Sequence, residues 1–237
     1  MEYIRAIQFR NTVLTAALTF LLAVIHPSCS HQPTKPASSA DKIGIDVSHY
    51  QGHIDWANIK QINEVHYVFV KTTEGLGFID PLSRDNFRGL KQAAIPFGSY
   101  HFFDPSLDPE QQAVFFIQHA ARPLTLPPVL DIEISQGMSP EEIKNAAKTW
   151  LLKVEQELGC KPIIYTDVDY WKTNLGPEFN DYKIWLAEYQ NKLFVPAGMT
   201  TWSIWQYSDD GYVDGINGFV DMNQLNLDLN SLESLLC

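Results

Sequence analysis

The sequence predicts an α/β fold built on a closed barrel of eight strands. From Lys42 onward, short apolar runs rich in β-branched residues alternate with longer amphipathic stretches, which is the pattern of repeated βα units around a parallel sheet. Eight such runs favour closure, and 237 residues lie near the lower end of the length that a barrel needs. The connections after the fifth to seventh runs are too short for full helices. We therefore expect an irregular TIM-like β/α barrel with reduced helices in its second half.

Each expected element has a local signal. Ser139 and Glu142 form a capping box that begins a long helix, which Gly159 is placed to end. Asp108 repeats this start signal, and a third helix is expected before Pro96. The strands are expected at Ile43–Val47, Val65–Lys71, Phe97–Phe103, Pro128–Glu133, Pro162–Thr166, Lys183–Tyr189, Thr201–Tyr207 and Phe219–Met222.

The first residues have the architecture of an export signal. Arg5 and Arg10 precede an uncharged apolar run over residues 12–25. This run is shorter than the roughly 20 residues that a membrane-spanning helix needs. We therefore expect a removed signal peptide over residues 1–28, an extracytoplasmic location, and a folded domain over residues 42–237.

Cys29 is a candidate lipidation site, because a cysteine just after the apolar run resembles a bacterial lipoprotein processing site. His26 and Pro27 depart from that pattern, so ordinary signal cleavage and secretion remain the alternative. Residues 29–41 are rich in Pro, Ser, Ala and Lys, which predicts a flexible tether. A lipidated Cys29 would hold the domain on a membrane, in the periplasm or at the cell surface.

Charge and cysteine usage limit the partners. A net charge of −11 without a basic run argues against nucleic acid or an anionic membrane held by electrostatics. Cys160 and Cys237 could form a disulfide in an oxidising compartment, although two unrelated thiols fit the sequence equally well. His49 and His101 lack zinc-ligand spacing, so we expect no metal and no cofactor. We expect a monomer.

Two carboxylates, Asp131 and Glu133, end the fourth expected strand. Residues two apart on a strand share a face, and the carboxyl ends of barrel strands are where such enzymes assemble their sites. Repulsion and partial burial would raise the pKa of one acid and keep it protonated, which is the division of labour that glycoside hydrolysis requires. Alone, this pattern is also typical of a solvated strand end.

Two further acids are expected at the same mouth. Asp46 ends the first expected strand and Asp221 the last, and these strands are adjacent in a closed barrel. Four acids in one cavity repel one another unless a substrate or bound protons relieve the repulsion. The four acids together therefore predict a functional site.

Ordered motifs over residues 44–223 resemble glycoside hydrolase family 25, the Chalaropsis-type lysozymes. The one departure that we note is Tyr50, where the family often carries Trp. The motifs are GIDVSHYQG at 44–52 with IDW at 54–56, FVKTTEG at 69–75, GSYHF at 98–102, LDIE at 130–133, IYT at 164–166, IWLA at 184–187, WQYS at 205–208 and VDMN at 220–223.

The resemblance implies an N-acetylmuramidase that hydrolyses the β-1,4 bond between N-acetylmuramic acid and N-acetylglucosamine in the glycan strands of peptidoglycan. It implies Glu133 as general acid, with Asp131 stabilising an oxazolinium-like intermediate formed by the substrate's own N-acetyl group. Cα atoms two apart on a strand lie about 6.6 Å apart, wider than the roughly 5–5.5 Å of direct carboxylate attack. Inversion stays open as well. The resemblance places Asp46 and Asp221 in the same site as supporting acids.

Other residues near strand ends are candidates for binding or stacking on sugar, with core packing as the alternative for the aromatic ones: Tyr100, Tyr165, Trp185 and Gln206. Lys71 and Glu74 are expected to form a structural ion pair. Two alternative functions are a chitinase-like endo-N-acetylglucosaminidase and an inactive cell-wall-binding barrel. The first usually carries a longer acidic run, which is missing before Asp131.

Overall fold

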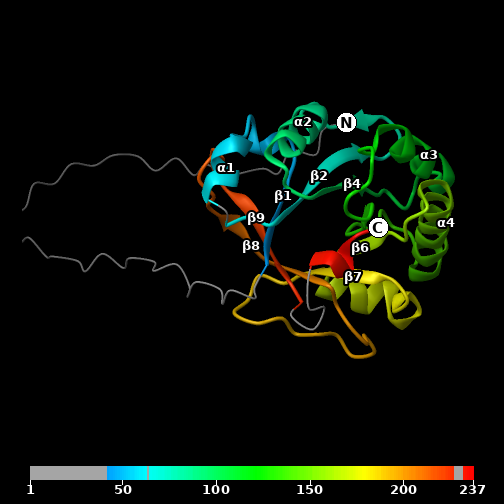
Figure 1. Cartoon of the computed structure of the whole chain (residues 1–237). Helices are drawn as coiled ribbons and strands as arrows, with labels where there is room; N and C mark the ends of the chain where they lie inside the picture. The colour runs from blue at the N-terminus through cyan, green and yellow to red at the C-terminus, as the bar shows by residue number, and fades with distance from the viewer. Residues whose placement is uncertain (1–41, 63, 227–231) are drawn as a thin grey trace, which may run out of the picture. The chain divides into compact units, whose positions relative to one another are not determined.

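The structure is a computed structural model that describes residues 42–62, 64–226 and 232–237 (Figure 1). Within these residues, eight strands close into a barrel in the order β1-β2-β4-β5-β6-β7-β8-β9, with β9 returning to β1. The strands are β1 (Ile43–Val47), β2 (Tyr67–Glu74), β4 (Phe97–Phe102), β5 (Val129–Asp131), β6 (Ile163–Asp167), β7 (Lys183–Ala187), β8 (Ile204–Gly211) and β9 (Val220–Leu225). The irregular α/β barrel is confirmed. The expected signal peptide and tether, with Cys29, lie outside the described residues.

The direction of β9 differs from the parallel sheet that we expect. It runs antiparallel to both of its neighbours, β1 and β8, whereas the pairs from β1 round to β8 are parallel. Only residues 212–219 connect β8 to β9, and this is too short for the crossover that a parallel pair requires. The amino end of β9 therefore lies at the mouth formed by the carboxyl ends of the other strands.

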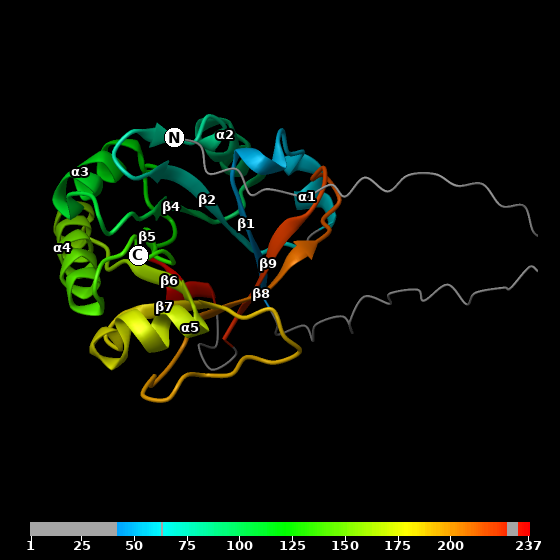
Figure 2. The same ribbon diagram turned by 180° about the vertical axis from the view of Figure 1, so that it is seen from behind.

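The helices lie outside the barrel, and the four longest all precede β6. They are α1 (Trp56–Ile62), α2 (Ser83–Ala93), α3 (Pro109–His119) and α4 (Pro140–Leu158), followed by α5 (Val168–Tyr170), a π-helical turn η2 (Trp171–Leu175) and the 3₁₀ turns η1 (His49–Gln51), η3 (Pro177–Phe179) and η5 (Leu232–Leu235). Figures 1 and 2 show α1 with α2, and α3 with α4, on different sides of the barrel. In the part of the chain that the structure describes, no helix is long and apolar enough to span a membrane.

The predicted helix signals are confirmed. Ser139 and Glu142 cap each other's backbone at the start of α4, and Gly159 ends it in a left-handed conformation, φ 67°. Asp108 caps α3. The pattern of apolar residues does not predict α1, because seven residues are too few to display a helical period. The second half is irregular, as expected from its short connections.

Alternation along the strands separates an inner core from two outer layers. Inward-facing Phe69, Val129 and Ile163 belong to the core inside the barrel, whereas Leu130 and Ile164 pack outward beneath α3 and α4. A second outer layer joins β1 and β2 to α1 and α2. The apolar core fills the barrel, so the polar side chains of the inner face gather at its mouth.

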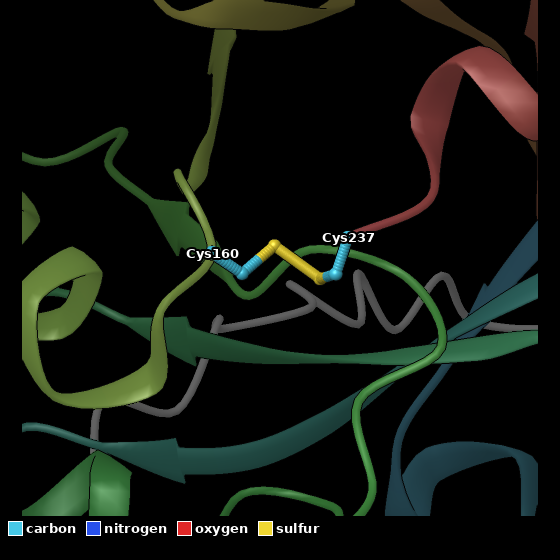
Figure 3. The surroundings of a disulfide bond; sticks show 2 residues. All are labelled: Cys160 and Cys237. Carbon is cyan, nitrogen blue, oxygen red and sulfur yellow. A yellow bond between two sulfur atoms is a disulfide. The ribbon is translucent and has the colours of Figure 1, made fainter.

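A short strand and a disulfide complete the fold. β3 (Phe78–Ile79) pairs antiparallel with the end of β2. Cys160, just after α4, forms a disulfide with Cys237 across a Cα–Cα distance of 5.4 Å (Figure 3). The sequence leaves open whether these two cysteines pair or remain free thiols, and in the structure they form a disulfide. It fixes the C-terminal turn against the chain leading into β6.

Candidate active site

The side chains of Asp131 and Glu133 point to the same face of the barrel wall. Leu130 and Ile132 are buried in the layer beneath α3 and α4, so the alternate positions face inward. The backbone stays extended past the end of β5, because the Ile132 N–H donates to the Tyr165 carbonyl at 3.0 Å. Asp131 is 6% exposed, whereas Glu133 is exposed at the mouth.

The environment of Asp131 favours its protonated form. Burial raises its pKa well above the usual value, and the negative charge of Glu133 adds to this, while the positive charge of Lys71 opposes it. The Oδ1 atom of Asp131 is buried without a hydrogen-bond partner, which is costly for an ionised carboxylate. The raised pKa of Asp131 thus follows first from its burial and then from the charge of Glu133.

Asp46 and Asp221 face each other across the seam between β1 and β9, where they are register partners. Their carboxyl groups share a hydrogen bond. Burial raises the pKa of Asp46 to about 6, although hydrogen bonds from Asn223 and Gln206 oppose the shift. Burial and the charge of Asp46 raise the pKa of Asp221 to about 9. At neutral pH, Asp221 therefore keeps its proton and donates it to ionised Asp46.

An amide pair holds Asp46 in place. Its Oδ2 accepts hydrogen bonds from Gln206 Nε2 at 2.9 Å and from Asn223 Nδ2 at 2.7 Å. The Gln206 Oε1 in turn accepts from the hydroxyls of Tyr165 at 2.8 Å and Tyr189 at 2.7 Å. These bonds fix the orientation of the amide and so of the carboxylate behind it.

Trp185 supports this network from the core. Its indole is 2% exposed, packs 4.9 Å from the ring of Phe69, and donates to Asn223 Oδ1 at 2.8 Å. It is therefore covered on its faces and takes the packing role rather than stacking on sugar. Sequence reasoning missed Asn223 and Tyr189, although Asn223 shares the inward parity of Asp221 and Tyr189 ends the sixth expected strand, Lys183–Tyr189.

Lys71 and Tyr100 bring further polar groups to the acids. Lys71 Nζ lies 2.7 Å from Glu74 Oε2, and it is only 8% exposed. The expected ion pair is present, and its charge also acts on Asp131. The pKa of Tyr100 is raised by burial and then by several nearby aspartates, which include Asp46 and Asp131. Tyr100 therefore lies among the acids of the mouth.

The two histidines have structural partners. His101 is buried, with its ring nitrogens 2.8 Å from Thr73 Oγ1 and 3.2 Å from Gln112 Oε1, and burial lowers its pKa to about 3. His49 Nδ1 lies 2.8 Å from Asp80 Oδ2. Across residues 42–62, 64–226 and 232–237, no group of three or more His, Cys, Asp or Glu side chains is arranged to hold a metal ion.

Carboxyl groups that keep protons at neutral pH beside others that ionise are what a glycoside hydrolase needs at a barrel mouth. The sequence model of glycosyl hydrolases family 25 matches residues 45–216, and the chain belongs to this family. It is 31% identical to lysozyme M1 of Streptomyces globisporus over 207 residues, which cover 81% of this chain and 70% of that protein.

Two further comparisons agree with this membership. The chain is 28% identical to the N,O-diacetylmuramidase of Chalaropsis sp over 198 residues, 75% of this chain and 93% of that protein. A crystal structure of the bacterial lysozyme from Streptomyces coelicolor superposes with a TM-score of 0.76 at 31% identity, and covers 82% of this chain and 94% of that one.

The Asp46–Asp221 pair should make stability depend on pH. An acid whose pKa is higher in the folded than in the unfolded chain carries an extra folded-state proton between the two values, so stability falls as pH rises through that window. The pKa values of the pair place this window between the usual pKa near 3.8 and about 9. We expect Asp221→Asn to flatten this slope and to unfold at higher urea concentration than wild type at pH 8.

Urea titrations from pH 4 to 9 measure this dependence. Asp181→Asn replaces an exposed acid that precedes β7, away from the mouth, and serves as the matched control. Its slope should equal that of wild type. Parallel slopes for wild type and Asp221→Asn would show that the pair does not hold the extra proton.

Proposed function

We propose that this protein is a lysozyme, an N-acetylmuramidase that hydrolyses the β-1,4 bond between N-acetylmuramic acid and N-acetylglucosamine in peptidoglycan. The observation that carries the proposal is the emergence of Asp131 and Glu133 together at the mouth that Asp46 and Asp221 also face. Family membership and the names of the relatives support the same activity.

Glu133 is the general acid in this proposal. It is exposed at the mouth, where a glycosidic oxygen can reach it, and it follows directly from the wall that fixes Asp131. The raised pKa of Asp131 favours a proton on the pair. Positive charge that develops on the bound sugar favours the ionised form of Asp131. The proton of the pair is then held by Glu133, which donates it to the leaving glycosidic oxygen.

Asp131 stabilises the reacting sugar by electrostatic attraction. Its burial strengthens the attraction between its carboxylate and an oxazolinium-like cation formed by the substrate's N-acetyl group, because the surrounding dielectric is low. The Asp46–Asp221 pair adds at most one negative charge near neutral pH, since Asp221 holds its proton. The mouth is thus acidic enough to favour a cation without four full charges repelling one another.

The two alternative functions have less support. The segment before Asp131, residues 126–130, is buried and apolar, and it supplies no further acid of the chitinase-like kind. An inactive wall-binding barrel has no need of a buried carboxyl group with a raised pKa beside an exposed glutamate at the carboxyl end of β5.

Export places the enzyme at its substrate. We infer an extracytoplasmic protein with residues 1–28 removed, tethered to a membrane through lipidated Cys29, because peptidoglycan lies outside the cytoplasm. The catalytic domain acts as a monomer in this proposal, since the acids of the mouth come from strands of one chain. The disulfide between Cys160 and Cys237 accords with an oxidising compartment.

Glu133→Gln should reduce turnover on purified peptidoglycan by a factor of about 10² to 10⁴, because the amide cannot donate the proton. The fold should be unaffected, since Glu133 is exposed. Reducing ends in solution measure the rate, and mass spectrometry after borohydride reduction identifies them. Wild type should give muramic acid ends.

The matched control is Glu110→Gln, which makes the same change in the exposed first turn of α3 and should leave the rate within twofold of wild type. Glucosamine ends would support the glucosaminidase alternative. Equal binding and no cleavage by wild type and Glu133→Gln would support the binding barrel.

The lipid proposal predicts the mature N-terminus. After expression of the full chain in a bacterium that processes lipoproteins, the mature protein should begin at Cys29 and carry the mass of attached acyl chains. Cys29→Ser should leave a protein without that mass and should release it from membranes. An unmodified wild-type chain that begins after Cys29 contradicts lipidation and leaves the catalytic proposal untouched.

A further inference from the structure

We propose that four exposed aromatic side chains at one rim of the mouth, Tyr50, Phe78, Tyr212 and Phe219, form a binding track for sugars of the glycan strand beyond the bond that is cut. We call them the aromatic row. The inference rests on the proposed function and extends it, because it assigns recognition of long strands to a surface outside the four acids.

All four side chains come from the mouth end of the barrel. Tyr50 lies in η1, which begins two residues after β1 ends, and Phe78 lies in β3 against the end of β2. Tyr212 follows the last residue of β8, and Phe219 precedes the first residue of β9. Phe219 is therefore two residues from Asp221, so the row runs directly into the acidic site.

Contacts join the members into one surface. The ring of His49 lies 4.2 Å from that of Tyr50 and 5.6 Å from that of Phe78. The rings of Tyr212 and Phe219 lie 5.0 Å apart. Further contacts link the two halves of the row through Gln51, whose Nε2 donates to the Phe219 carbonyl at 3.2 Å. The row thus consists of two groups of rings, one beside β3 and one at the connection between β8 and β9, which this hydrogen bond joins.

The row is exposed yet held in place. Tyr50 is 81% exposed, Tyr212 75%, Phe219 55% and Phe78 38%. His49, between Tyr50 and Phe78, is fixed by Asp80, which accepts hydrogen bonds from its backbone N–H at 2.9 Å and interacts with its ring. A second anchor holds the 212–219 connection, because the Asp55 N–H donates to the Gly215 carbonyl at 2.8 Å. Grouped exposed aromatic rings on fixed backbone are typical of a binding surface.

An uncharged sugar chain fits this surface better than an anionic ligand does. The end of β8 and the connection after it carry three exposed acids, Asp209, Asp210 and Asp214, which repel carboxylates such as those of peptide stems. Pyranose rings present apolar C–H faces that pack on aromatic rings without needing a charge. Because the cut bond lies at the acids, the sugars on one side of it continue over the adjoining rim.

The test compares long and short substrates. The long substrate is peptidoglycan glycan strands stripped of peptide stems, with the lactyl carboxyl groups that stripping exposes capped as methylamides so that the strand is uncharged. The short one is a four-sugar fragment, capped in the same way, that spans the cut bond. For Tyr212→Ala and Phe219→Ala, we expect the ratio of kcat/KM on long strands to kcat/KM on the fragment to fall about threefold to tenfold relative to wild type. Leu152→Ala removes a 62% exposed apolar side chain from α4, and its ratio should match wild type.

The outcomes separate the inference from the function beneath it. An unchanged ratio in Tyr212→Ala and Phe219→Ala, with both substrates cut by muramidase chemistry, overturns the aromatic row and leaves the lysozyme proposal standing. Cleavage of neither substrate by wild type overturns the lysozyme proposal itself. Binding of intact peptidoglycan by Glu133→Gln, without binding of stripped strands, assigns the row to peptide stems and overturns the glycan track.

Discussion

The structure depends on the burial of acids where the barrel closes. Asp46 on β1 meets Asp221 on β9 at the seam that completes the ring of strands, and the two can be buried together only because one proton remains between them. The amides of Gln206 and Asn223 satisfy the carboxylate of Asp46. The seam that completes the barrel therefore also holds the acids of the site in place.

The apolar interior makes this arrangement possible. Large side chains fill the barrel below the acids, and Phe69 and Trp185 are in contact there. The polar side chains therefore lie at the mouth, and the apolar packing beneath them excludes water. Low dielectric raises the pKa of Asp131. The same burial that costs stability favours the protonated form of an acid at the mouth, and glycosidic bond cleavage requires an acid that keeps its proton.

Much of this could be predicted from the sequence, because alternation on strands is local. Asp131 and Glu133 fall on the inward face by parity alone, and the apolar runs locate the strands to within a few residues. The direction of β9 was not predicted, because a short apolar run has the same sequence pattern in a parallel and in an antiparallel sheet. The sequence also could not show which acid would be the more deeply buried, or that Tyr189 would reach Gln206, because these follow from packing between distant segments.

The most direct test of the account is the protonation of its aspartates, measured by carbon-13 NMR of labelled carboxyl groups from pH 3 to 10, with assignment by Asp→Asn substitution. We expect Asp221 to remain protonated at pH 7, Asp46 to lose its proton near pH 6, and Asp131 to titrate well above the usual pKa of an aspartate. Ionisation of all three in the ordinary range near pH 4 would contradict the account, because the acids would then be solvated separately rather than buried together.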